Sequence, residues 1–475
     1  MFQKHSVVVL CFFIVGALTA QKKWTLEECI RYAIEHNISI RQSALDVKST
    51  EIDRKDAFGA FLPSANANAT HSWNVGLNQN ITTGLLENQT TQFTSAGFNV
   101  GVDLYNGLQN QNRFRRTQMA RISSQYQLLK MQEDIALNVA NAYLQILFNI
   151  ENLKVQEEQL KNDQIQKERS EELVNAGVIP RGDLLEVKAT VAADEQRVVT
   201  AKNTLLISTL SLAQLLQLDD FENFDILAEN YAVEETPLLS QTPDAIFAKA
   251  KETRTELKIA QANLEIAERD VKIARGAYQP RVQGFYVFNT RAAYADRIIG
   301  SQIDPLNPTI PIGVVEGTNQ QVIRPNFTAL TGGAASIFDQ FQTNKGQNYG
   351  LQINIPILNG FSARNNVQRS KIALDRSKIA IEQQELDLER NVFTAFTDVR
   401  GTLNAYESAL TALESREEAF RYAKERYDVG MMNAFEYNQA QTLLVNAQSE
   451  VIRTKYDYIF RVKILEFYFG IPIIK

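Results

Sequence analysis

The stretch EIDRKDAFGAFLP at residues 51–63 returns as ERDVKIARGAYQP at residues 268–280. Seven of the thirteen positions are identical, and both copies end on Gly-Ala, an aromatic residue, one further residue and proline. The offset is 217, the separation of Pro63 and Pro280. Two unrelated helices would not reproduce this string, so the sequence predicts an internal tandem duplication.

A second block repeats at a larger offset. Asn106-Gly107 matches Asn359-Gly360, and Gly177 matches Gly430, both at an offset of 253. The second copy therefore carries an insertion of 36 residues between Pro280 and Asn359. The predicted organisation is a signal peptide (1–20), a first repeat of helix, two strands and a long helical hairpin (21–218), a linker or equatorial segment (219–241), and a second repeat (242–475) with a long extracellular loop at about 292–345.

Each repeat is predicted to contain long helices. The first helix begins after Thr25, a favourable N-cap, and ends at Pro63. The helix after Gly107 continues to about Val174 without proline, which corresponds to roughly 100 Å. Its counterpart carries apolar residues at alternating steps of four and three, the spacing of a helix-on-helix seam. These are Val392, Phe396, Val399, Leu403, Tyr406, Leu410 and Leu413, matched in the first copy by Ala136, Ala140, Tyr143, Leu147 and Ile150.

Both long helices stop at a glycine turn, at Gly177 and Gly430, and fold back into a shorter helix. The shorter helices are predicted to end near Leu218 and Phe469. An ordinary coiled coil is the alternative on the helices alone.

The segments that flank each connecting loop alternate between apolar and polar residues, which is the period of a β-strand. Segments of about ten residues with one apolar face can cross a bilayer as part of a closed barrel. A soluble sheet half-covered by helices is the alternative. The predicted barrel residues are Ala65, Ala67, Ala69, Trp73, Phe98, Val100, Val102, Leu351, Ile353 and Ile355, and His71 interrupts their pattern.

Four strands cannot close a transmembrane barrel, because lipid leaves no partner for an open edge. Three chains would supply twelve strands, and two would supply eight, barely wide enough for the enclosed side chains. The connecting loops differ between the copies. Residues 81–92 form a short polar connection, whereas the long loop at about 292–345 either caps the outer mouth or is a tolerated surface insertion.

The amino terminus predicts export. A basic start, an apolar run over residues 6–15 and small residues up to Ala20 indicate a cleaved signal peptide. Cys11 and Cys29 are too few for a disulfide framework, and we expect Cys29 to be buried on a helix. The net charge of −6 argues against a nucleic-acid partner. No catalytic motif, cofactor motif or metal-ligand spacing is present in the sequence, so we expect neither an enzyme nor a bound cofactor.

In their duplicated order, several short motifs resemble the outer-membrane efflux protein family, the TolC-like channels, over nearly all of the mature chain. They are Trp24-Thr25-Leu26-Glu27-Glu28, Leu62-Pro63, Leu104-Tyr105-Asn106-Gly107 and Ile357-Leu358-Asn359-Gly360. The resemblance implies a mixed α/β membrane protein: a homotrimer with a twelve-stranded barrel in outer-membrane lipid and a periplasmic coiled-coil tunnel. Implied partners are a periplasmic adaptor and an inner-membrane pump of RND, ABC or MFS type, in an efflux or type I secretion system.

The resemblance also implies that the hairpin ends dock onto the adaptor. The predicted docking residues are Val174, Gly177, Val178, Ile179, Val429, Gly430, Met431 and Met432. The predicted entrance constriction comprises Asp183, Tyr427, Glu436 and Gln439. A ring of Glu436 would favour cations, whereas a solvated acid at a helix start is the alternative. Gln439 stands where the family often has a second acid, and Met432 where it often has a base.

An exit duct is the main functional prediction. A soluble periplasmic scaffold or adaptor made of helical hairpins is the alternative from another class. It predicts recovery without detergent and no role for the alternating strands.

Overall fold

The computed structural model describes residues 23–472, apart from 220, 222 and 230. The predicted signal peptide lies outside the described residues. The described chain divides into two compact units. The helical unit contains residues 23–51, 119–265 and 375–472, and the sheet unit contains residues 52–118 and 266–374. The long helices contribute residues to both units.

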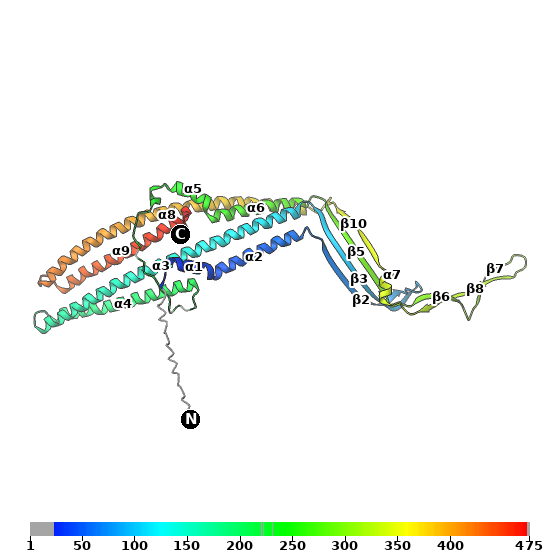
Figure 1. Cartoon of the computed structure of the whole chain (residues 1–475), viewed down its shortest axis with the longest axis horizontal. Helices are drawn as coiled ribbons and strands as arrows, with labels where there is room; N and C mark the ends of the chain where they lie inside the picture. Colours follow the sequence, from blue (N-terminus) through cyan, green and yellow to red (C-terminus); the bar gives the residue numbers. More distant parts are fainter. Residues whose placement is uncertain (1–22, 220, 222, 230, 473–475) are drawn as a thin grey trace, which may run out of the picture. The chain divides into compact units, whose positions relative to one another are not determined.

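The helices occur as four matched pairs whose members have equal lengths of 11, 22, 67 and 36 residues. Members of the first two pairs are 217 positions apart and members of the last two are 253 apart, which confirms the internal duplication. The pairs, coloured along the chain in Figure 1, are α1 (Leu26–His36) with α5 (Pro243–Thr253), α2 (Ile38–Gly59) with α6 (Thr255–Gly276), α3 (Gln109–Asn175) with α8 (Ser362–Asp428), and α4 (Arg181–Leu216) with α9 (Ala434–Phe469).

The single helix predicted from Thr25 to Pro63 is wrong, because the chain breaks it at Asn37. Thr25 does cap α1, through a reciprocal capping box with Glu28. Asn37 then takes an extended backbone with ψ of 129°. Its side-chain oxygen accepts the N–H of Ser39 at 2.9 Å and its amide donates to the carbonyl of Leu215 at 3.2 Å. These bonds, to the first turn of α2 and to the last turn of α4, compensate for the interrupted helix.

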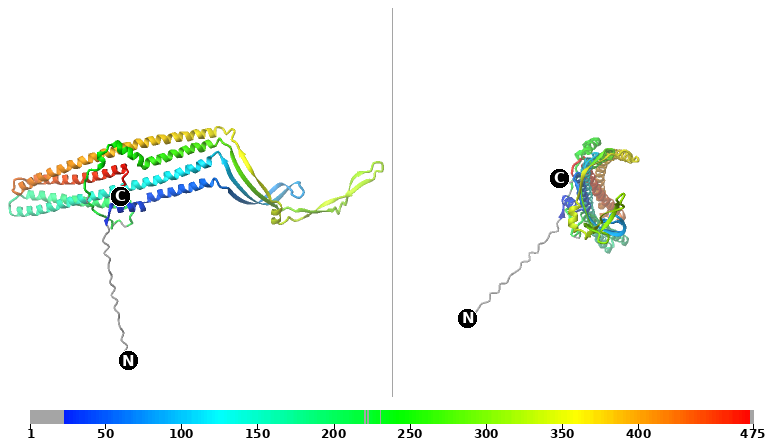
Figure 2. Two further views of the ribbon diagram at one scale, coloured as in Figure 1. Left: turned by 45° about the horizontal axis from the view of Figure 1, so that its top comes forward. Right: turned by 90° about the vertical axis from the view of Figure 1, so that its right-hand side faces the viewer.

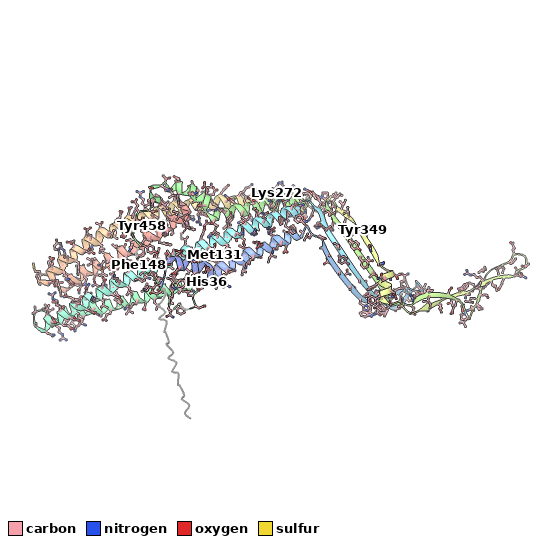
Figure 3. All side chains as sticks on the ribbon, in the orientation of Figure 1. His36, Met131, Phe148, Lys272, Tyr349 and Tyr458 are labelled. Atoms are coloured by element: carbon pink, nitrogen blue, oxygen red, sulfur yellow. The ribbon has the colours of Figure 1, made fainter. Side chains whose placement is uncertain are left out.

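The core of the helical unit joins helices that are far apart in sequence. Cys29 and Ile30 of α1, Tyr143 and Leu147 of α3, and Leu212 of α4 are all buried in one cluster. Met131 and Phe148 pack against this cluster and are labelled on α3 in Figure 3. A second cluster contains the predicted seam residues Val392 and Val399 of α8 with Leu465 of α9. The heptad spacing therefore identified the buried side of both long helices.

The sheet unit is built around one antiparallel sheet with the strand order β10-β5-β3-β2. The four strands run side by side in Figure 2. Their bounds are β2 (Ser64–Gln79), β3 (Leu86–Asn106), β5 (Arg281–Ala293) and β10 (Gly346–Asn354). β2 and β3 extend further than predicted, so the connection expected at residues 81–92 shrinks to residues 80–85. The paired side chains of Asn80 and Glu87, 2.9 Å apart, close this tighter turn.

The insertion expected as a long loop at about 292–345 contains regular structure. β6 (Arg297–Ile303) pairs with β9 (Phe327–Gly332), β7 (Thr309–Val314) pairs with β8 (Gln321–Pro325), and α7 (Ile337–Thr343) follows. Its β-branched residues favour pairing, and the glycines and prolines that suggested irregular structure fall partly within these strands. Each two-stranded ribbon also contains a register shift, between Ile298 and Gly300 in the first and between Pro311 and Gly313 in the second.

Short elements complete the described chain. β1 (Lys23–Trp24) pairs in parallel with β4 (Asp225–Ile226), and η1 (Pro237–Ser240) precedes α5. Among the described residues, no helix combines the length and apolar content needed to span a membrane.

The break between α5 and α6 is held by a buried arginine. Arg254 stands at the position that Asn37 occupies in the first copy, and only 4% of its side chain is exposed. Its guanidinium group lies 3.1 Å from carboxylate oxygens of Glu133 and Glu256 and 3.8 Å from the ring centroid of Phe467. Burial raises the pKa of Glu133, and the charge of Arg254 opposes that rise.

Replacing Arg254 with methionine should destabilise the helical unit by about 3–5 kcal/mol, because two largely buried carboxylates lose their counter-charge. Arg421→Met is the matched control, since the pair of Arg421 with Glu418 is exposed to solvent and should contribute little to stability. Thermal unfolding followed by circular dichroism compares the two variants. Equal shifts in midpoint would contradict a structural role for the buried cluster.

Candidate channel wall and helical hairpin ends

The main sheet has one continuous apolar face. Cross-strand pairing places Ala67 opposite Phe98, Phe98 opposite Phe288, and Tyr286 opposite Tyr349. Figure 3 labels Tyr349 on β10. The predicted barrel residues on this face are Ala65, Ala67, Ala69, Trp73, Phe98, Val100, Val102, Leu351 and Ile353, whereas Ile355 follows the end of β10.

The opposite face of the sheet is mostly polar, with Phe93, Phe285 and Val287 as apolar exceptions. Asn66 lies opposite Asn99, and Ser64 lies opposite Gly101. At one end of this face Arg281 and Asp103 form an ion pair at 2.9 Å. Toward the other end the guanidinium group of Arg291 lies 3.5 Å from the ring centroid of Phe93. One apolar and one hydrated face is the pattern of a strand that separates lipid from water.

Both edges of this sheet are open in one chain. β2 and β10 are the terminal strands of the described sheet, so each pairs along one side only. Unpaired N–H and C=O groups along such an edge need a further strand. Within the hydrocarbon of a membrane that need is absolute, because no water is available to bond them.

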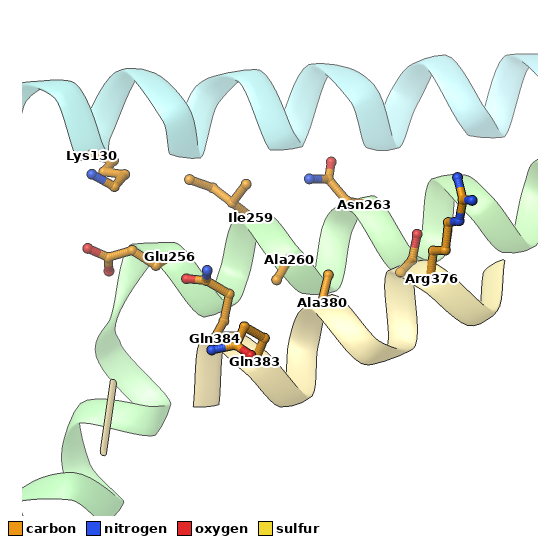
Figure 4. A pocket seen from close by; sticks show the side chains of 10 residues that line it. Lys130, Glu256, Ile259, Ala260, Asn263, Arg376, Ala380, Gln383 and Gln384 are labelled. Carbon is orange, nitrogen blue, oxygen red and sulfur yellow. The ribbon is translucent and has the colours of Figure 1, made fainter. Parts of the chain in front are cut away.

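The long helices follow the same order as the strands. In the helical unit, Arg121 of α3 pairs with Glu51 of α2 at 3.8 Å, and Ser123 of α3 donates to Asn263 of α6 at 3.0 Å. A groove of about 580 Å³ separates α3 and α6 from α8 (Figure 4). Its lining combines Lys130 and Glu256 with the apolar Ile259. α2 and α8 are therefore the outer helices of this layer.

Both outer helices carry exposed apolar residues at intervals of seven. This spacing places the residues of each helix on one stripe. On α2 the stripe consists of Ile38, Leu45 and Ile52, and on α8 it consists of Ile372, Ile379 and Leu386. The two outer helices thus leave apolar surface exposed in a single chain.

The two helical hairpins end in turns of the same geometry. Gly177 and Gly430 have φ values of 75° and 77°, in the left-handed region that favours glycine. The N–H after each glycine bonds back to the helix, from Val178 to Leu173 at 2.9 Å and from Met431 to Arg426 at 2.8 Å. This 6→1 bond is the mark of a Schellman helix end.

The predicted docking residues surround these two turns. Val178, Val429 and Met431 are largely exposed, whereas Val174, Ile179 and Met432 are partly buried. Asn433, which sequence reasoning missed, caps α9 by accepting the N–H of Glu436 at 2.8 Å. Its signal was present, since Asn three positions before an acid is a common N-cap pattern.

The predicted entrance residues are not joined to one another in one chain. Within the described part of the chain, no hydrogen bond or ion pair joins any two of Asp183, Tyr427, Glu436 and Gln439. Tyr427 instead accepts a hydrogen bond from Gln166 at 2.9 Å and stacks on Tyr437. Glu436 and Gln439 are exposed on α9, and Asp183 is partly buried at the start of α4.

Sequence reasoning missed the polar contacts that connect one hairpin to the other. Arg169 of α3 forms an ion pair with Asp428 of α8 at 2.5 Å. Asn438 of α9 donates to Thr190 of α4 at 3.1 Å. These residues could have been found only by knowing which helices are neighbours, because each is an ordinary polar residue in sequence.

A pair of carboxyl groups is buried where α3, α4 and α9 meet. Asp163 and Asp194 are 2% and 1% exposed and lie close to each other. Gln159 and Gln441 each donate to Asp163 at 2.7 Å, and Arg197 donates to Asp194. Burial, and then the proximity of Asp163, raise the pKa of Asp194 to about 7. Asp194 therefore holds a proton under mildly acidic conditions.

The signal for this pair lies in the seam itself. Asn149, Asp163 and Ser170 are buried on α3 and differ by multiples of seven positions. Toward the hairpin end, the buried positions of α3 are thus occupied by polar instead of apolar residues. Buried polar residues in such a seam specify which helices pair, at a cost in stability.

The raised pKa of Asp194 predicts that stability falls as pH rises. Between the ordinary Asp pKa of about 3.9 and about 7, the folded chain keeps a proton that the unfolded chain releases. Asp194→Asn removes this effect. The variant should gain more than about 1 kcal/mol over the parent at about pH 8, and little at about pH 4, in unfolding experiments. Asp375→Asn, at an exposed pair with Lys378, should show no such change. A gain in the free energy of unfolding that did not depend on pH would contradict the raised pKa of Asp194.

The described residues offer no clear site for metal chemistry. His, Cys, Asp and Glu side chains form no group of three or more that could hold a metal ion in this part of the chain. The candidate functional regions are therefore the sheet, with its apolar and mostly polar faces, and the ends of the two helical hairpins.

A two-faced sheet joined by long helices to hairpin turns defines a membrane channel class, and comparison with known proteins identifies it. The family model described as outer membrane efflux protein matches residues 29–217 and 246–470. This chain belongs to that family. Membership confirms the predicted family, the outer-membrane location and the transport function. The members of this family are transport proteins.

Individual relatives are distant in sequence and similar in fold. Outer membrane protein TolC of Escherichia coli is 21% identical over 467 residues, which cover 96% of this chain and 84% of TolC. The Campylobacter jejuni CmeC outer membrane channel superposes with a TM-score of 0.76 at 16% identity, covering 94% of this chain and 85% of CmeC. The structure of CusC gives 0.75 at 16% identity, with coverage of 94% and 91%. These similarities confirm the predicted fold class.

Proposed function

We propose that three copies of this chain form the exit duct of a tripartite efflux or type I secretion system. The observation that carries the proposal is the four-stranded sheet with one apolar face, one polar face and two open edges. Pairing β2 of one copy with β10 of the next gives a closed twelve-stranded barrel, which satisfies every edge. The exposed stripes of α2 and α8 supply apolar surface for the same neighbours.

The duct is passive in this proposal. A periplasmic adaptor docks at the turns around Gly177 and Gly430, and an inner-membrane pump of the RND, ABC or MFS type delivers the cargo. The equal lengths of the two hairpins support this, because they bring both turns to the same distance from the start of their long helices. Outer-membrane lipid is the remaining partner in this proposal, which the similarity to outer membrane protein TolC supports. The predicted repeat boundaries at 21–218 and 242–475 belong to the same proposal.

Conductance is the direct test of the duct. Purified protein added to planar bilayers should form channels that favour cations, because three copies of Glu436 would line the entrance. Glu436→Gln should reduce the cation-to-anion permeability ratio by about twofold or more at low salt. Glu417→Gln, on an exposed part of α8, is the control and should leave the ratio unchanged. Recovery in the soluble fraction without conductance would contradict the duct and favour the periplasmic scaffold.

The docking role of the hairpin ends predicts a specific defect in Gly177→Val and Gly430→Val. Nothing lies within 4 Å of an added Cβ at either position, so the cost comes from the left-handed φ alone, roughly 1–2 kcal/mol or more for a branched residue. Adaptor co-purification and efflux should fall while the barrel still assembles. Gly401→Val, in open space within α8 and with an ordinary helical φ, is the control. Normal adaptor binding by both turn variants would exclude these turns as docking ends.

A further inference from the structure

The short helix α7 is fixed to the end of strand β5. The side-chain amide of Gln340 donates to the carbonyl of Ala293 and accepts its N–H, both at 2.9 Å. Thr290 donates its hydroxyl to the carbonyl of Phe341 at 2.8 Å, and the Asn344 amide donates to the carbonyl of Arg291 at 2.8 Å. With hydrogen bonds to three residues near the end of one strand, α7 has a defined position within the sheet unit.

Burial shows which face of the sheet α7 covers. Thr290 and Ala292 are 6% and 0% exposed, whereas the alternating Arg291 is exposed. Thr290 lies opposite Ala96, and Ala292 lies opposite Thr94. These positions belong to the face that carries Ala67, Phe98 and Phe288. α7 therefore lies on the apolar face, at the end of the strands farthest from the long helices.

One large apolar side chain of α7 has no partner. Ile337 and Phe341 are partly buried, but Phe338 is 81% exposed. With seven residues, α7 is far too short to cross hydrocarbon. In its sequence, IFDQFQT, the three partly buried residues Ile337, Gln340 and Phe341 are spaced by three and four positions and so share one side of the helix, which Phe338 does not join.

Aromatic residues with polar atoms gather at the same end of the same face. The rings of His71 and Trp73 are 4.4 Å apart, and those of His71 and Tyr294 are 5.5 Å apart. The hydroxyl of Tyr294 lies 3.0 Å from that of Thr94, and the N–H of Tyr294 bonds to the carbonyl of Gln92, which is opposite Trp73. Such side chains are typical of the boundary between hydrocarbon and water. This also accounts for His71, the exception in the apolar alternation of β2.

We propose that α7 is an interfacial helix that inserts Phe338 into outer-leaflet lipid at the headgroup boundary and so sets the height of the barrel in the membrane. The proposal rests on the proposed barrel. Lipid is the occupant because α7 continues the apolar face of the sheet at its aromatic end, and because that face has no other cover within the sheet unit. Ser336 caps the start of α7 by accepting the N–H of Asp339 at 3.2 Å, and its hydroxyl donates to the exposed carboxylate of Asp339 at 2.6 Å.

Spin-label accessibility tests this proposal in the full mature chain. Phe338→Cys carries a nitroxide label, and the protein is reconstituted into vesicles of phosphatidylcholine and phosphatidylglycerol. Collision with oxygen, which enters hydrocarbon, is compared with collision with a water-soluble nickel chelate. Cys29 is buried in the helical core, and the unsubstituted chain measures its background labelling.

Two matched positions calibrate the result. Ala67→Cys, on the apolar face of β2, should collide with oxygen and not with the chelate. Leu306→Cys, 87% exposed between β6 and β7, should collide freely with the chelate. We expect the label at position 338 to fall between them and to collide with oxygen at least twofold more than the label at 306.

Three outcomes would overturn the proposal. A label at 338 that behaves as at 306 would place α7 in water. A label that is immobilised and shielded from both reagents would place Phe338 against a second copy of the chain. If Ala67→Cys also proved accessible to the chelate, the barrel itself would fail, which separates failure of the proposed function from failure of the interfacial helix.

Discussion

The structure depends on one constraint: a backbone N–H or C=O group in hydrocarbon must be paired. The main sheet of this chain satisfies the constraint within its interior and leaves it unsatisfied along β2 and β10. Its apolar face disfavours exposure of the sheet to water. Its open edges disfavour insertion of a single chain into lipid. Closure with further copies resolves both conditions at once, and the polar face then encloses a water-filled passage.

The long helices repeat this logic in water. Their order, α2, α3, α6 and α8, follows that of the strands to which they connect, and the outer helices carry the unpartnered apolar stripes. In water the driving force is the burial of apolar side chains. Polar groups on a helix surface can bond to water, but apolar side chains leave water only by packing against another helix. Polar residues near the hairpin ends, above all the buried Asp163 and Asp194, make the contacts there specific and sensitive to protons.

Much of the fold could be predicted from the sequence because the duplication is preserved in spacing. The offsets of 217 and 253 reappear unchanged in the limits of α1 to α4 and α5 to α9. Period-two alternation identified the sheet faces, and heptad spacing identified Val392 and Val399 as buried. The break at Asn37 could not be predicted, since its amide bonds to Leu215, a residue of a helix far along the chain. The ribbons and α7 within the insertion were missed because the turn-forming residues there obscured short strands.

The candidate site divides in the same way. Glycine turns were identifiable because a left-handed backbone restricts the residue type. Contacts such as Gln166 with Tyr427, or Asp163 with Gln441, depend on which helices become neighbours, and local sequence carries no record of that. Two buried aspartates cannot be distinguished from two solvated aspartates by sequence alone.

The central claim is that this chain forms its wall only with copies of itself. Native mass spectrometry of the detergent-purified protein measures the copy number directly. The account predicts a complex with three times the mass of the mature chain, and a single folded chain that retains its strand content would contradict it.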